Sequence, residues 1–365
     1  MYDQIRNDTL FGMLYAVVSA LFLAACCYLL FRQGNAFARD VTPPVRLRRW
    51  TAAYFAATAV CHLWYMQIFF LTSAEDIMMT DLIGGLLDSV LAVPLVICVM
   101  LNMLQDRRRP LWPIPLMIAP FVVGEVYSIA TLSYAVIPML HVYLLLLSIC
   151  IAIYMFRATR QYGRWLRDNY ADLEHKEIRL SLLVLAVFLI FFVIYENSDT
   201  GLVVTYLLQV DVLVLIGLLL WRVETLQELG GGALPEEDPA EAERMAASTL
   251  IPANIGPLLE MKCEAAQLYL QHDLTLAQLA QTIGTNHSYL SRFFAQQGLT
   301  YNAYINGLRV RHFIRLYHDA VSELRIFTAQ QLAYESGFHS YSTFAASFKQ
   351  VTGQTVSAWM RDPDK

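Results

Sequence analysis

Two short stretches in the last third of the chain combine small polar side chains with a basic residue. They are His287, Ser288, Ser291 and Arg292 in the first stretch, and Tyr341, Ser342, Thr343 and Lys349 in the second. Such side chains can hydrogen-bond to phosphates and base edges in the major groove of DNA, which is about 12 Å wide and admits an α-helix. The other interpretation is that Arg292 is only a solvated surface charge and that Tyr341 packs against a neighbouring helix.

A degenerate repeat predicts the elements that must hold these side chains outward. In each copy a Leu-Ala pair precedes a glycine, a helix-capping residue follows, and large apolar residues come four and eight positions after the cap. These residues are Leu279, Ala280, Gly284, Asn286, Leu290 and Phe294 in the first copy, and Leu332, Ala333, Gly337, Ser340, Phe344 and Phe348 in the second. Glycine tolerates the backbone of a tight turn, and Asn and Ser favour helix starts. The repeat therefore predicts two helix-turn-helix motifs.

Further residues carry a resemblance to a known family. They are Ser288 to Arg292 and Phe294, Tyr304, Leu308 and Arg309, and a signature formed by Ala333, Gly337, Phe338, Ser340, Ser342, Phe344, Phe348, Lys349 and Gly353. With these residues, the segment from about 255 to 361 resembles the DNA-binding domain of the AraC/XylS regulators. The resemblance implies an all-helical domain that binds double-stranded DNA through two recognition helices in successive major grooves. It assigns base contacts to Ser288, Ser291, Arg292, Tyr341, Ser342 and Thr343.

Two features predict modest DNA affinity for a single domain. The second recognition helix has Ala346 where many family members have a basic residue, whereas Val356, in place of a usual proline, loosens the match at the end of the domain. Residues 252–365 contain nine Lys and Arg against eight Asp and Glu. Because neutralisation of phosphates supplies much of DNA affinity, we expect useful binding from a homodimer, in which the second domain acts at a high effective concentration.

The first 221 residues contain the long apolar runs of a membrane domain. Charged residues make up only 16% of the chain and its mean hydropathy is +0.44, which excludes a disordered protein and a simple soluble enzyme. A spanning helix needs about 20 apolar residues. Seven runs qualify, namely residues 10–31, 50–71, 82–104, 111–130, 135–156, 180–195 and 202–221. The predicted fold class is therefore all-α, a seven-helix transmembrane bundle followed by an all-helical domain with two helix-turn-helix motifs.

Basic residues in the connections predict the orientation. The connections at residues 32–49, 105–110 and 157–179 contain fourteen Lys and Arg, whereas the opposite set contains only Arg6. Positively charged connections remain in the cytoplasm. We therefore expect a multi-pass protein of the bacterial inner membrane with its N-terminus outside and its C-terminal domain, residues 251–365, in the cytoplasm. Three glycines followed by an acidic run predict a flexible linker over 222–250 between this domain and the membrane domain, residues 1–221.

Five ionisable residues fall inside the predicted spans, where a charge is costly. They are His62, Asp88, Glu125, His141 and Asp211. One hypothesis is a polar pocket open to the outside that takes a small ligand or a proton, and the other is that these side chains pair to hold helices together. The sequence shows no metal-ligand spacing, no cofactor motif and no catalytic constellation. We therefore expect neither a metal, a cofactor nor an enzyme.

The functional hypothesis is a membrane-anchored, one-component transcription regulator that binds specific DNA sequences. Its membrane domain would sense an unidentified small-molecule or protein signal, or hold two copies together. The alternative is an integral-membrane transporter or enzyme with a helix-turn-helix regulatory module. A third hypothesis is that proteolysis in the linker releases a soluble regulator.

Overall fold

The computed structural model describes residues 6–179, 182, 186, 201–229 and 254–361. Within these ranges the regular secondary structure is helical, apart from one isolated antiparallel bridge between Tyr170 and Thr275. The chain divides into two compact units. The first comprises Met1–Gln161 and Ile178–Leu229, and the second comprises Tyr162–Glu177 and Gly230–Lys365. The predicted all-α class is confirmed.

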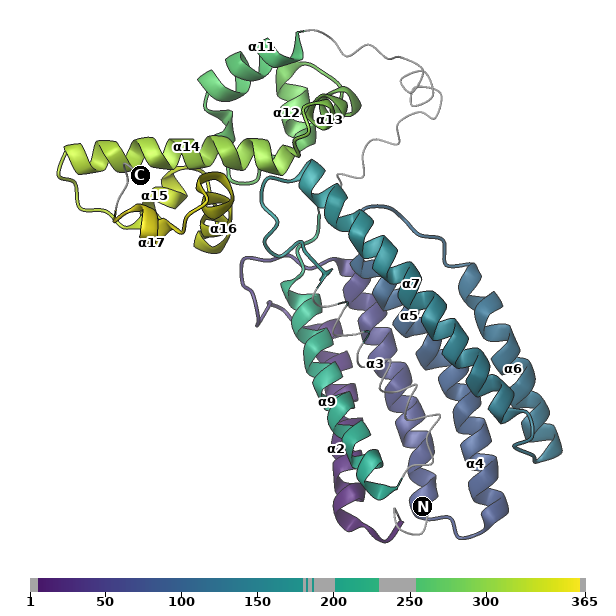
Figure 1. The fold of residues 1–365 in the computed structure, drawn as a ribbon. Coiled ribbons are helices and arrows are strands. Elements are labelled where there is room, and N and C mark those ends of the chain that lie inside the picture. The colour runs from purple at the N-terminus through teal and green to yellow at the C-terminus, as the bar shows by residue number, and fades with distance from the viewer. Residues whose placement is uncertain (1–5, 180–181, 183–185, 187–200, 230–253, 362–365) are drawn as a thin grey trace. The chain divides into compact units, whose positions relative to one another are not determined.

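The first unit is built from long helices that run side by side (Figure 1). They are α2 (Thr9–Phe31), α3 (Val45–Tyr65), α4 (Ala74–Leu87), α5 (Val93–Met103), α6 (Pro113–Thr131), α7 (Ile137–Asn169) and α9 (Leu202–Thr225). A π-helical turn, η2 (Asp88–Ala92), joins α4 to α5 into one continuous helix. The last part of α7, from Tyr162, belongs to the second unit.

Five helices are long and apolar enough to cross a membrane. They are α2, the joined helix Ala74–Met103, α6, α7 and α9. Helix α3, which covers most of the predicted run 50–71, begins with three arginines among its first five residues and is not in this set. The predicted run 180–195 lies outside the described residues except for positions 182 and 186. Five candidate spans are shown, and the count of seven stays a prediction.

The chain from Arg222 to Leu229, where the sequence predicts the start of a linker, is packed into the first unit. Helix α9 continues to Thr225, and Glu224 forms a buried ion pair with Arg32 at 2.9 Å. The Gln105 side-chain amide donates to Gln227 O and accepts from Leu229 N, both at 3.0 Å. The remainder of the predicted linker, 230–250, lies outside the described residues.

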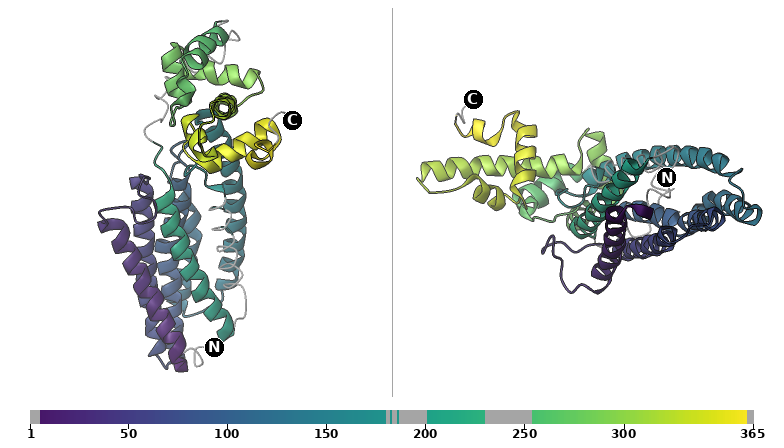
Figure 2. Two further views of the ribbon diagram at one scale, coloured as in Figure 1. Left: turned by 90° about the vertical axis from the view of Figure 1, so that its left-hand side faces the viewer. Right: turned by 90° about the horizontal axis from the view of Figure 1, so that it is seen from below.

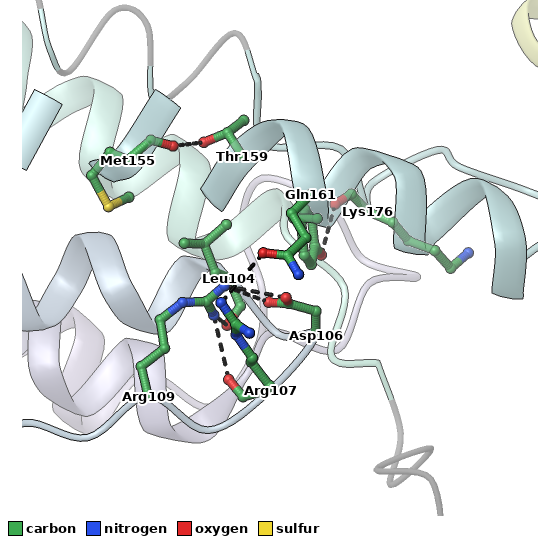
Figure 3. A network of polar contacts seen from close by, with 9 residues as sticks. Leu104, Asp106, Arg107, Arg109, Met155, Thr159, Gln161 and Lys176 are labelled. Carbon is green, nitrogen blue, oxygen red and sulfur yellow. Dashed lines mark hydrogen bonds and ion pairs between the residues drawn. The ribbon is translucent and has the colours of Figure 1, made fainter. Parts of the chain in front are cut away.

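The arginine-rich connection between α5 and α6 is held by its own polar contacts (Figure 3). The guanidinium of Arg109 pairs with the Asp106 carboxylate at 2.8 Å and donates to the backbone oxygen of Leu104. Arg107 donates to the Gln161 side chain on α7 at 3.3 Å. A connection that carries three consecutive arginines is therefore ordered rather than loose.

The second unit contains shorter helices. They are α11 (Ile255–Leu259), η3 (Glu260–Ala265), η4 (Leu268–Leu270), α12 (Leu276–Ile283), α13 (His287–Gln296), α14 (Tyr301–Ser322), α15 (Ala329–Glu335), α16 (Tyr341–Thr352) and α17 (Val356–Trp359). Helices α12 and α13 form the first helix-turn-helix copy, and α15 and α16 form the second. Helix α14 joins them (Figure 2). It contributes side chains to both apolar cores.

Candidate nucleic-acid interface

The first copy follows the predicted order of cap, helix, glycine turn and helix. Thr275 caps α12 through a reciprocal pair of hydrogen bonds with Gln278. Gly284 ends α12 at a φ of +76°, in the left-handed region that glycine adopts without strain. The Asn286 side chain then accepts from Ser288 N at 2.7 Å and starts α13. These local signals fix which face of α13 points away from the core.

The second copy repeats this construction. Thr328 caps α15, and Ser340 caps α16 by accepting from Thr343 N at 3.3 Å. Gly337 occupies the turn at a φ of +90°. Phe344 and the other core phenylalanines of this copy, Phe338 and Phe348, are buried as expected. With these side chains inward, the opposite face of α16 is left for ligands.

The structure gathers the predicted DNA contacts on the outer faces of the two recognition helices, but exposes them unequally. On α13, all four residues are half-buried, namely His287, Ser288, Ser291 and Arg292. On α16, Tyr341, Ser342 and Lys349 are exposed and Thr343 is half-buried. The Tyr341 ring also lies 5.6 Å from the Phe344 ring, so it packs partly on its own helix. Whether these eight residues bind DNA stays a prediction.

A buried arginine joins the two copies. The Arg309 guanidinium donates to Tyr269 O at 2.8 Å and to Gln271 O at 2.6 Å, and it lies 5.7 Å from the centre of the Phe338 ring. Burial lowers the pKa of Arg309 to about 10, so the side chain is still charged at neutral pH. The second copy presses on the same segment, because a Cβ on Gly337 would lie 2.8 Å from the Cα of Leu270.

We call the contacts of Arg309 and Gly337 with residues 269–271 the joint. The joint fixes the spacing of the two recognition helices. Sequence reasoning included Arg309 in the family motif but did not predict that it is fully buried and bonded to backbone oxygens. The available signal was its position among the apolar residues of α14, next to Leu308 and Val310.

Residues 169–172, the last residue of α7 and the three that follow it, also lie against this interface. They belong to the second unit. Asn169 Oδ1 lies 2.7 Å from Nε2 of His287, and Asp172 Oδ1 accepts from the hydroxyl of Thr343 at 3.3 Å. Sequence reasoning missed this contact, because no local pattern connects a segment near residue 170 with helices more than 100 residues later.

The ionisable residues of the predicted spans do not assemble into a metal site. The His62 ring stacks on Tyr15 of α2 at 4.8 Å between ring centres, and Asp88 accepts from the Tyr65 hydroxyl at 3.1 Å. Glu125 is buried beside Gly85, while His141 and Asp211 lie on α7 and α9. Among the described residues, no group of three or more His, Cys, Asp or Glu side chains could hold a metal ion.

Comparison with known proteins bears on the C-terminal region. The family model described as a helix-turn-helix domain matches residues 279–362. Those residues form an AraC-type helix-turn-helix domain. This confirms the resemblance predicted from the repeat, for a little under a quarter of the chain. No solved structure matches the chain significantly.

Curated relatives match over the same region. One is an uncharacterized HTH-type transcriptional regulator from Staphylococcus aureus, 30% identical over 101 residues. Others with the same description come from strain MRSA252, at 31% identity, and from strain COL, at 30% identity. Each match covers 27% of this chain and 13% of the relative. The similarity is therefore confined to one domain, and the chain spans 13% of the length of these relatives.

Proposed function

We propose that this protein is a membrane-anchored transcription regulator that binds specific sites on double-stranded DNA through α13 and α16. The observation that carries the proposal is the AraC-type domain in one chain with five helices long enough to span a membrane. The relatives that share the domain are described as HTH-type transcriptional regulators. Two recognition helices fixed by one joint suit two successive major grooves, about 34 Å apart.

Genome-wide DNA occupancy of the full-length protein tests this function. We expect Arg292→Ala to remove site-specific occupancy, because Arg292 lies on the outer face of α13. Arg311→Ala is the matched control, since it removes the same charge from an exposed position on α14. Occupancy is compared at equal protein levels in the membrane. Unchanged occupancy of the Arg292→Ala protein would contradict the assignment of this face.

The proposed topology places the DNA-binding unit in the cytoplasm of a bacterium, with the N-terminus outside. It rests on the excess of basic residues in alternate connections. Cysteines introduced at Glu75 and Arg108, which are exposed residues at opposite ends of the joined helix Ala74–Met103, test it. A membrane-impermeant thiol reagent should label Glu75→Cys on intact cells and Arg108→Cys only after permeabilisation. The reverse pattern would exclude contact with the chromosome.

The proposed active form is a homodimer that responds to a small-molecule or protein signal at the membrane domain. The near-neutral charge of residues 252–365 supports the need for two domains. Photobleaching of a fluorescently tagged full-length protein should show two copies in each spot. Single copies at sites of occupied DNA would contradict the dimer.

A further inference from the structure

The segment Asn169 to Asp172, which we name the α7 tail, is built into the DNA-binding domain. Ala171 is fully buried and belongs to the same apolar core as helices α12 to α14. The Asn302 side chain donates to Ala171 O at 2.6 Å, and the Asn306 side chain donates to the same oxygen at 2.9 Å. Asn306 is buried and Asn302 is half-buried. Two side-chain amides on one helix that donate to one backbone oxygen indicate a specific binding position for this segment.

The segment after the tail is anchored as well. The hydroxyl of Tyr162, on the last part of α7, donates to Lys176 O at 3.1 Å. Tyr170 forms the antiparallel bridge with Thr275, the residue that caps α12. The chain therefore enters the domain at the end of α7, reaches the core at Ala171 and turns back within a few residues.

The seated tail contacts both recognition helices at their first turns. Asn169 meets His287, the first residue of α13, and Asp172 meets Thr343 in the first turn of α16. His287 and Thr343 are two of the residues predicted to contact DNA. The tail is thus bonded to the same side chains that DNA would need.

Asp172 also carries a negatively charged oxygen, as a DNA phosphate does. Asp172 is 5% exposed, and its carboxylate lies near the first turn of α16, where the helix dipole favours an anion. Hydroxyl groups and helix N-termini are common ligands of DNA phosphates. The charge of Asp172 also acts on the buried Arg309, which strengthens its hold in the domain. Asp172 therefore occupies, with like charge, a position suited to a phosphate oxygen.

We propose that the α7 tail competes with DNA for the two recognition helices, and that movement of α7 sets the outcome. The proposal rests on the proposed function. Helix α7 runs unbroken from Ile137 to Asn169, and it is one of the five candidate membrane spans. An α-helix is stiff along its axis at 1.5 Å per residue, so a shift of its membrane part is transmitted to the tail. The signal thus changes the equilibrium between two states of the tail, one bound to the recognition helices and one released from them.

The first test measures DNA affinity of the full-length protein in lipid nanodiscs. The probe is a DNA fragment recovered from its strongest occupied site. We expect Asp172→Ala to bind this fragment about 10-fold more tightly, within the 5- to 150-fold range of typical coupling between sites. Glu177→Ala is the matched control, because it removes one negative charge from an exposed position in the same connection. Equal affinity of Asp172→Ala and the unmodified protein would overturn the proposal.

The second test needs no substitution and therefore does not depend on how the variant folds. Hydrogen exchange is followed in the peptide that covers residues 166–176 of the full-length protein, with and without the same DNA fragment. Displacement of the tail predicts faster exchange in this peptide when DNA binds. Unchanged or slower exchange with bound DNA would overturn the competition and leave the proposed function intact. Absence of DNA binding by every variant would instead contradict the proposed function.

Discussion

The two helix-turn-helix copies have the same local construction but different surroundings. Both have a threonine cap, a left-handed glycine turn and a capped recognition helix. The core of the first copy is completed by residues from outside the repeat, including Ala171 of the α7 tail. The second copy closes its core with its own C-terminal residues Val356 and Trp359. The repeat therefore specifies the motif, while its neighbours decide how much of the recognition helix is exposed.

The largest expected effect comes from breaking the joint that holds the copies together. Arg309→Met would leave the buried backbone oxygen of Tyr269 without its donor and would also remove the hydrogen bond to Gln271 O. We expect a loss of about 3–5 kcal/mol in the free energy of unfolding, because two hydrogen bonds to a charged group are lost, at about 1.5–3 kcal/mol each. Urea-dependent labelling of the buried Cys263 thiol, quantified by mass spectrometry on the full-length protein in detergent, measures this loss.

Arg311→Met is the control for this prediction. Arg311 is exposed on the same helix, so its replacement should change the free energy of unfolding by less than about 0.5 kcal/mol. Equal urea resistance of the Arg309→Met and Arg311→Met proteins would show that the joint contributes nothing.

The next largest effect is expected from replacing a turn glycine with alanine, and it should differ between Gly284 and Gly337. Alanine at either position costs about 1–2 kcal/mol, because its Cβ disfavours a positive φ. Gly337→Ala adds about 1–3 kcal/mol of overpacking, since the new Cβ would lie 2.8 Å from Leu270 Cα, whereas nothing lies within 4 Å of that position on Gly284. The same Cys263 labelling should therefore show a lower urea midpoint for Gly337→Ala than for Gly284→Ala. The opposite order would contradict the close packing of the second turn on the joint.

Much of this comparison follows from local sequence. The Leu-Ala pairs, the two glycines and the capping residues act within one turn of their own helix, so their spacing predicts both motifs. Apolar run length likewise predicts the five long helices of the first unit, although the helix predicted for residues 82–104 begins at Ala74. The spacing after the cap also places Phe294 in the core correctly.

The parts that sequence did not predict depend on contacts between distant residues. The seating of Ala171 depends on Asn302 and Asn306, more than 130 residues further along the chain. The packing of residues 222–229 depends on Gln105 and Arg32, which the glycine-rich composition that follows does not reveal. Local patterns carry no record of such pairings.

A smaller effect is expected from removing the threonine cap of the first helix in each copy, which tests whether the two caps contribute equally. Thr275→Ala and Thr328→Ala each remove the side chain that caps the first helix of a copy. Loss of such a cap costs about 0.5–2 kcal/mol. Hydrogen exchange of the α12 and α15 peptides should therefore speed up by similar factors, each in its own copy. A large effect in one copy alone would mean that the helix in the other copy is stabilised by its surroundings and not by its cap.

The smallest expected effect is a pH dependence of the free energy of unfolding that arises from His312, beside the joint. His312 Nδ1 lies 3.2 Å from the Tyr269 hydroxyl and 3.1 Å from Nη2 of Arg315, and Asp319 also acts on the ring. Burial lowers the pKa of His312, the charge of Arg315 lowers it further, and Asp319 opposes them. The folded state therefore favours the neutral ring. Its contribution to stability is present above the unfolded pKa of about 6.5 and is lost as the pH falls below it.

His312→Gln isolates this contribution, because glutamine retains hydrogen-bonding capacity for Tyr269 but does not titrate. Between pH 7 and pH 5, we expect the urea midpoint of the unmodified protein to fall further than that of His312→Gln. Comparing the two proteins at each pH cancels the intrinsic pH dependence of Cys263 labelling. Parallel declines would show that protonation of His312 does not weaken the contact between α14 and Tyr269, and that the acid sensitivity of this domain arises elsewhere.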